Sequence, residues 1–124
     1  MGFLDKFEGQ IYAIFRIVFG VLFMAHGVHK FFNFPTPFPY TPLTPLTITA
    51  GAIELVAGIL IAIGFFTRPA AFLSSGLMAV AYWMAHGSKG LYPITNGGEL
   101  AILFSFAFLY IAAKGAGQWA IDKK

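Results

Sequence analysis

Four long stretches of almost entirely apolar residues dominate this sequence of 124 residues. They lie at about 9–32, 48–66, 69–87 and 97–114. A helix needs roughly 20 apolar residues to cross the hydrocarbon core of a bilayer, and in lipid its backbone groups must be paired internally. We therefore expect an all-α integral membrane protein, a four-helix bundle that forms a single transmembrane domain over residues 1–124.

Charged residues are too few to cover the surface of a water-soluble domain. They make up 10% of the chain, whereas hydrophobic residues make up 58%; a soluble domain normally carries about 25% charged residues. The lipid bilayer is therefore the expected surrounding. The net charge is only +3 and the basic residues are scattered, which argues against nucleic-acid binding. The chain has no cysteine, which excludes disulfides and thiolate metal sites.

The basic residues predict how the bundle is oriented, because Lys and Arg favour cytoplasmic connections. One side of the predicted bundle carries Lys6, Arg68, Lys114, Lys123 and Lys124, and the other carries Lys30 and Lys89. Both termini are therefore expected in the cytoplasm. The connection between the first two helices, rich in proline and aromatic residues, would then lie on the outer face as an ordered flap or a stiff linker.

Glu54 is the residue that is hardest to explain as packing. It lies within the stretch "AGAIELVAGILIAIGFF", about 9 Å below the outer end of the second helix. An unpaired carboxylate at that depth costs a few kcal/mol, so Glu54 needs a proton, water, or a partner such as Lys30 or a histidine. His26, His86 and Glu99 fall at similar heights, which predicts a polar pocket in the outer half of the bundle.

Each predicted helix has one face that carries its polar groups, because successive side chains turn by 100°. We expect these four faces to point inward. Small residues on the first two faces would let those helices approach closely, and glycine-lined faces are also compatible with a homo-oligomer. The four faces contain Arg16, Gly20, Phe23, Gly27 and Lys30; Gly51, Glu54, Gly58 and Ala62; Ser75, Met78, Tyr82 and His86; and Glu99, Leu103, Phe106 and Tyr110.

Most of these polar residues also have a structural explanation. Asn96 with Glu99 three residues later would suit the capping box of the fourth helix, and Arg16 and Lys30 would reach the headgroups by snorkelling. His86 would serve as an ordinary interfacial residue. The candidates for ligand binding or proton relay are His26, Lys30, Glu54, His86, Glu99, Tyr82 and Arg16.

A metal or haem iron is an alternative occupant of the same region. The motif "HGVHK" places two histidines three residues apart, a spacing that brings both imidazoles to one side of a helix. Carboxylates and imidazoles on facing helices are the ligands of metal sites in helix bundles. The candidate ligands are His26, His29, Glu54, His86 and Glu99.

Several motifs, taken in order, resemble the DoxX family of small bacterial membrane proteins. They are "HGVHKFF", "AIELVAGILIAIGFFTRPAA", "NGGELAIL" and "GAGQWAID", and they extend over nearly the whole chain. The resemblance implies a multi-pass protein of the bacterial inner membrane that is linked to respiratory or redox chemistry. The family's recurring polar positions correspond to His26, Gly27, Lys30, Glu54, Gly58, Arg68, Gly98 and Glu99.

Three functions follow as hypotheses. The first is a redox accessory or small oxidoreductase subunit that binds a quinone or another lipophile in the outer pocket and works with a redox partner protein. His26 or Lys30 would donate to a quinone carbonyl, and Phe23, Tyr82 and Phe106 would line the ring. The second is a metal- or haem-binding protein. The third is a scaffold or small transporter that docks a partner on the proline-rich flap. The sequence does not decide whether the protein is an enzyme.

Overall fold

The computed structural model describes residues 2–39 and 42–122, and these residues are predominantly helical with no strand among them. Four long helical segments follow one another, with short helices at the N-terminus and before the last of them. The elements are α1 (Gly2–Asp5), α2 (Glu8–Phe32), α3 (Pro45–Ile63), α4 (Thr67–Ala81), the π-helix η1 (Tyr82–His86), the 3-10 helix η2 (Gly87–Lys89), α5 (Pro93–Asn96) and α6 (Glu99–Lys114).

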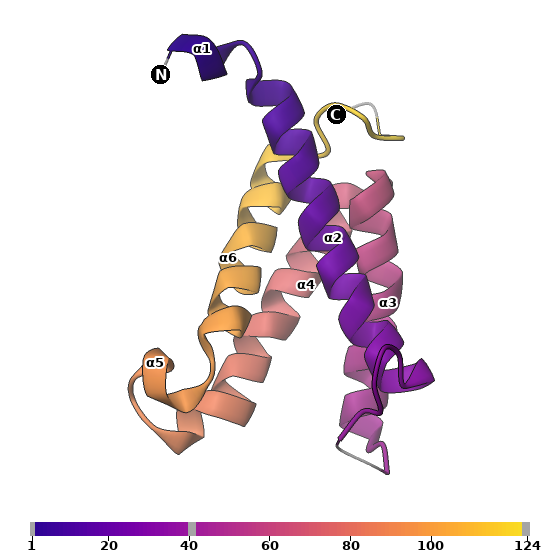
Figure 1. The fold of residues 1–124 in the computed structure, drawn as a ribbon, viewed down its shortest axis with the longest axis vertical. Helices are drawn as coiled ribbons and strands as arrows, with labels where there is room; N and C mark the ends of the chain where they lie inside the picture. Colours follow the sequence, from indigo (N-terminus) through magenta and orange to yellow (C-terminus); the bar gives the residue numbers. More distant parts are fainter. Residues whose placement is uncertain (1, 40–41, 123–124) are drawn as a thin grey trace.

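The long helices form two closely packed pairs, α2 with α3 and α4 with α6. Figure 1 shows that the pairs meet near the chain termini and diverge toward the opposite end. We call the first the tail end, because the C-terminal segment 115–122 lies there. The second is the pocket end, where residues 33–39, 42–44 and 87–98 lie between the helices.

Glycine sets the spacing between α2 and α3. A methyl group added at Gly58 would lie 2.5 Å from the backbone nitrogen of Met24, and one added at Gly27 would lie 2.8 Å from the carbonyl oxygen of Gly51. The two helix backbones are therefore in direct contact, as expected for small residues on facing membrane helices. This confirms the prediction that small residues let the first two long helices approach closely, and the two glycine faces belong to one chain.

Aromatic rings fill the core between α2 and α6. Phe23 and Phe108 have ring centroids 4.7 Å apart, and Phe19 meets Phe104 edge-on at 5.6 Å. Phe23 and Phe108 are completely buried, together with Ile61 of α3 and several residues of α4 and α6. Such ring pairs contribute about 0.5–1.5 kcal/mol each beyond the area they bury. The rings thus join the two helix pairs.

The outer surface of the helices is apolar. Val18, Val56, Phe72 and Leu103, one from each of α2, α3, α4 and α6, are all exposed. Both α2 and α3 are long and apolar enough to cross a membrane, and no more than a third of their most apolar stretches is buried. These helices are therefore not the core of a soluble domain, and their surface matches a lipid surrounding.

The helix boundaries differ from the predicted ones for identifiable reasons. The second long helix begins at Pro45 and not near residue 48, because Pro is favourable in a first helical turn and the Thr44 side chain caps it. It ends at Ile63, since Gly64 adopts a left-handed conformation. The short α1, with Leu4 and Asp5, was not predicted.

The predicted inward face of the fourth helix is wrong. Phe106 is 67% exposed, and Leu103, Tyr110 and Glu99 are exposed as well. The buried face carries Phe104, Ala107, Phe108 and Ile111. The prediction assumed that the acid marks the inner face, whereas the large rings on the other side of the helix bury more apolar area. The predicted faces of the other three long helices are buried at most of their positions.

Candidate functional site

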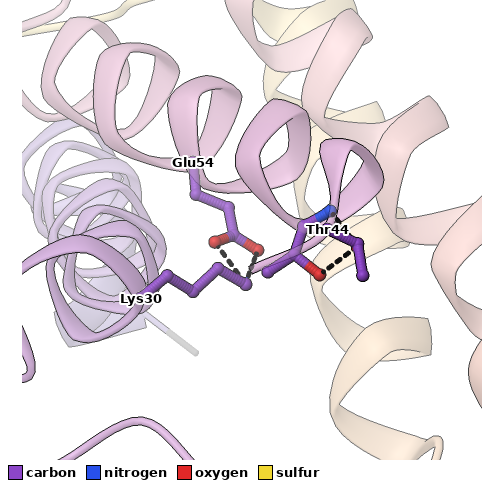
Figure 2. Close-up of polar contacts among 4 residues, drawn as sticks. Lys30, Thr44 and Glu54 are labelled. Atoms are coloured by element: carbon purple, nitrogen blue, oxygen red, sulfur yellow. Dashed lines mark hydrogen bonds and ion pairs between the residues drawn. The ribbon is translucent and has the colours of Figure 1, made fainter. Parts of the chain in front are cut away.

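Glu54 and Lys30 form an ion pair that joins α3 to α2. The Lys30 Nζ lies 2.6 Å from Oε1 and 2.8 Å from Oε2 of Glu54, so both carboxylate oxygens accept from one ammonium group. Figure 2 shows the lysine side chain reaching from its helix to the carboxylate. Glu54 is only 4% exposed. The lysine is thus the partner that a carboxylate at this depth requires.

The first turn of α3 fixes where Glu54 lies. The Thr44 side-chain oxygen accepts a hydrogen bond of 3.2 Å from the backbone nitrogen of Thr47, and Figure 2 shows Thr44 beside the ion pair. Glu54 follows on the face of α3 that carries Gly51 and Gly58. That face packs on α2, so the carboxylate is directed toward the interior and away from lipid.

A cavity of about 300 Å³ lies between the two helix pairs at the pocket end. Its lining includes the predicted polar residues His26, Glu54 and His86. Phe23 and Phe104 are among its apolar lining residues, and the Phe104 ring meets the His26 imidazole edge-on at 5.8 Å. The structure therefore brings one acid and two histidines, from three separate helical segments, to a single cavity with apolar walls.

Asn96 orients His86. The Nδ1 atom of His86 lies 3.1 Å from the backbone carbonyl oxygen of Asn96. Because a carbonyl oxygen only accepts, Nδ1 is the protonated nitrogen and Nε2 is left as an acceptor when the ring is neutral. The Asn96 side chain donates to the Tyr82 hydroxyl at 2.9 Å and accepts from the Gly98 backbone nitrogen at 2.8 Å. This network holds the imidazole at the cavity wall.

Five of the proposed residues lie outside the cavity lining, namely Arg16, His29, Lys30, Tyr82 and Glu99. Glu99 is exposed in the first turn of α6, and the residue that caps this helix is Gly98, which makes no side-chain cap. The predicted capping box is therefore wrong. Tyr82 is buried, and its hydroxyl accepts a hydrogen bond from the Asn96 side chain. His29 packs edge-on against Phe38, with ring centroids 5.3 Å apart, and its Nε2 is buried without a partner.

The candidate metal ligands do not converge. Within residues 2–39 and 42–122, no three His, Asp or Glu side chains are grouped as a metal ion would require. Of the five candidate ligands, three line the cavity, and one of those three is paired with a lysine. Tyr40, which with Phe38 would form the docking surface of the proline-rich flap in the scaffold hypothesis, lies outside the described residues.

Arg16 is buried at the tail end, far from the cavity, and does not snorkel. It is completely buried, and its guanidinium donates to backbone carbonyl oxygens only. The acceptors are Ile61 at 3.0 Å, Ala62 at 3.4 Å, Gln118 at 2.8 Å, Trp119 at 2.7 Å, and Ala116. Arg16 therefore fastens the C-terminal segment to α2 and α3, which is a structural role.

Two further contacts close the tail end. Arg68 donates to the carbonyl oxygens of Ala112, Ala113 and Lys114, the last residues of α6. The carboxylate of Asp122 accepts from the backbone nitrogens of Phe66 and Thr67, at 3.1 and 2.9 Å, where α4 begins. These hydrogen bonds, chiefly the one from Thr67, lower the pKa of the Asp122 carboxyl.

Sequence reasoning missed Asn96 as an organising residue. It was considered only as a helix cap, because it lies three residues before Glu99. The dipeptide Gly97-Gly98 that follows was the available signal. Gly97 has a left-handed conformation, and an added methyl group at Gly98 would lie 2.4 Å from the Tyr82 ring. An asparagine before such a tight turn is well placed to bond the backbone on both sides.

The fold and the surface define a small, all-helical membrane protein with a polar cavity between two helix pairs. The sequence profile of the family described as DoxX matches residues 11–87. The chain therefore belongs to the DoxX family, and the resemblance seen in its motifs is confirmed.

Two relatives come from Haemophilus influenzae, and both are named only as uncharacterized proteins. One is 44% identical over 130 residues, an alignment that covers 100% of this chain and 97% of the relative. The other is 29% identical over 90 residues, which covers 73% of this chain and 60% of the relative. No solved structure matches the chain.

Proposed function

We propose that the protein binds a quinone or quinol, or a lipophile with a similar ring, in the cavity between the helix pairs. In this proposal it serves as a redox accessory or small oxidoreductase subunit beside a redox partner protein. The observation that carries the proposal is the cavity itself, where His26, Glu54 and His86 share a wall with Phe23 and Phe104. Ligand pockets in proteins are typically apolar with a few converging polar groups.

The setting is a multi-pass protein of the bacterial inner membrane with both termini in the cytoplasm. The 15 residues of α4 and the five of η1 follow one another directly, and together they are roughly 30 Å long, about the thickness of the hydrocarbon core. Exposed apolar side chains on α6 also suit lipid. The excess of basic residues at the tail end supports a cytoplasmic location for that end.

The chemistry of the cavity suits a ring that carries hydroxyl or carbonyl oxygens. The Nε2 atom of His86 and the Glu54 carboxylate are acceptors for a quinol hydroxyl, and His26 is a donor for a quinone carbonyl. A volume of about 300 Å³ is at the small end for ligand pockets. It suits a single ring, with the isoprenoid tail extending toward lipid between the diverging helix pairs.

Quinone content and quinone-induced stabilisation test the proposal. We expect quinone in organic extracts of the purified protein, and we expect a soluble quinone analogue to raise its melting temperature in detergent. Glu54→Gln and His86→Gln should each weaken binding of the analogue about tenfold, the effect of losing one charge-assisted or buried hydrogen bond. The matched control is Glu99→Gln, the same chemical change at an exposed site, which should leave binding unchanged.

Two results would overturn the proposal. One is a preparation without quinone whose melting temperature does not respond to analogues. The other is equal analogue binding by Glu54→Gln and Glu99→Gln. If instead Phe38→Ala abolishes association with a partner protein while Glu54→Gln preserves it, the protein is a scaffold. Metal analysis and an optical spectrum of the same sample test the metal or haem alternative.

A further inference from the structure

A second hollow lies at the tail end, on the far side of the molecule from the cavity. It has a volume of about 550 Å³ and runs between α1, the first turns of α2 and the last turn of α6. Its lining combines both signs of charge with rings and aliphatic side chains, among them Glu8, Lys114, Ile11, Phe15 and Tyr110. We call it the tail-end groove. It has no part in the proposed quinone site.

Charges of both signs face this groove, because Asp5, Glu8 and Lys114 are among its lining residues. Glu8 and Lys114 both line it, yet the described residues show no ion pair between them. The Lys114 Nζ instead lies 5.1 Å above the ring of Tyr12, and the same three residues also line a smaller adjoining hollow of about 270 Å³. An acid and a base that face one groove without an ion pair between them are complementary to a zwitterion.

The groove continues into an apolar wall. Ile11 and Phe15 lie on α2 three and seven residues beyond Glu8, so this wall descends by roughly 10 Å from the charged rim. Tyr110 lies one helical turn before Lys114 on α6, and its ring meets the Tyr12 ring edge-on at 5.9 Å. A ligand with a charged head and a hydrocarbon chain matches this sequence of surfaces better than a water-soluble zwitterion does.

We infer that the tail-end groove binds a phospholipid whose headgroup carries a phosphate and a primary ammonium, that is, an ethanolamine phospholipid. Lys114 pairs with the phosphate, and the Glu8 carboxylate accepts hydrogen bonds from the ammonium. One acyl chain lies along Ile11 and Phe15. A quaternary ammonium offers no N–H donor to Glu8, and a glycerol headgroup offers no cation, so the groove discriminates among lipids by their headgroups.

Lipid competition measured by native mass spectrometry tests this inference on the full chain. Protein released from nanodiscs that contain equal amounts of phosphatidylethanolamine, phosphatidylcholine and phosphatidylglycerol should retain the ethanolamine lipid preferentially. Glu8→Gln should lower retention of the ethanolamine lipid roughly two- to fivefold, as expected for an exposed ion pair, with no effect on the choline lipid. Lys114→Gln should lower retention of all three lipids, because each of them carries the phosphate.

Matched substitutions at the pocket end serve as controls. Glu99→Gln and Lys89→Gln alter the same charges at exposed positions away from the groove and should leave lipid retention unchanged. Equal retention of the three lipids by the native protein would overturn the inference. So would unchanged retention in Glu8→Gln, or a preference for the glycerol lipid, since either result would leave the ammonium without a partner. Analogue binding at the quinone site should not change in any of these variants.

Discussion

The two ends of the molecule each bury a charged residue of α2 or α3 in an apolar surrounding, and they satisfy it in different ways. At the tail end, Arg16 is enclosed by five backbone carbonyl groups that use the donors of its guanidinium. At the pocket end, Glu54 is paired with a single ammonium group. It also lines a cavity that two imidazoles line. The surroundings of Arg16 are therefore closed, whereas Glu54 and the two imidazoles face open space.

This difference distinguishes a buried charged residue with a structural role from a candidate site residue more reliably than burial alone. A buried charge whose hydrogen bonds are all made by backbone has no capacity left for a ligand. A buried charge that faces a cavity, beside further groups able to donate or accept, retains that capacity. By this criterion Arg16 holds the fold together, and Glu54 with His26 and His86 is the site to test.

Replacing Arg16 should have the largest effect on stability. Arg16→Met removes the guanidinium and leaves buried carbonyl groups unpaired, so we expect a loss of about 3–5 kcal/mol in the free energy of unfolding. Arg16→Lys retains the charge but not the planar fork, and should lose less. Denaturation in mixed micelles measures both variants. A loss below about 1 kcal/mol in Arg16→Met would show that the tail is not fastened by this residue.

Breaking the Lys30–Glu54 pair should have a smaller effect, because the carboxyl group can take up a proton instead. Lys30→Met should cost about 1–3 kcal/mol, and Glu54→Gln less, since the amide still accepts from the lysine. The double variant Lys30→Met/Glu54→Gln should lose less than the sum of the single variants, by more than about 0.5 kcal/mol. Strict additivity in the same micelle assay would mean that the pair is not coupled.

The all-helical fold and the packing of its first two long helices could be predicted from local features. Apolar runs gave helices close to the observed ones, and glycines seven residues apart, such as Gly20 and Gly27, correctly marked the α2–α3 contact. The face of α6 could not be predicted, because it depends on which side of the helix the rings of α2 pack against. Phe104 and Phe108 decide that contact, and no local pattern reveals it.

The candidate site was predicted in part. The depth of the ionisable residues brought His26, Lys30, Glu54 and His86 to one end, and the structure places all four there. Glu99 has the same depth but lies on the outer side of its helix. Its depth alone therefore gave the wrong prediction, because the inward face of that helix was not known. The closure around Arg16 depends on the irregular segment 115–122, whose path follows no periodic pattern in the sequence.

Removing the cap on α6 tests the closed end more gently than removing Arg16. Arg68 is exposed and donates to three terminal carbonyl groups. Arg68→Met should therefore cost about 1 kcal/mol and should speed amide hydrogen exchange in the last turn of α6. Lys89→Met, an exposed lysine at the pocket end, is the matched control and should cost less than about 0.5 kcal/mol. Equal exchange in both variants would contradict the capping role.

The smallest expected effect is a pH dependence confined to the tail end. Hydrogen bonds from the backbone of Thr67 and Phe66 lower the pKa of Asp122 in the folded protein. A carboxyl group with a lowered folded pKa stabilises the fold above its unfolded pKa of about 3.9, and that contribution is lost as the pH falls through the folded value. Limited proteolysis of the tail should therefore accelerate only below about pH 4.

Asp122→Asn should remove this acid-dependent step, because the amide does not titrate. Among the described residues, the hydrogen bonds of the Asp122 carboxylate go to Phe66 and Thr67 at the tail end, so proteolysis in the segment 87–98 should be the same for both proteins at every pH. A parallel change at the two ends would show that the tail and the cavity respond as one unit, and the comparison between a closed and an open end would then fail.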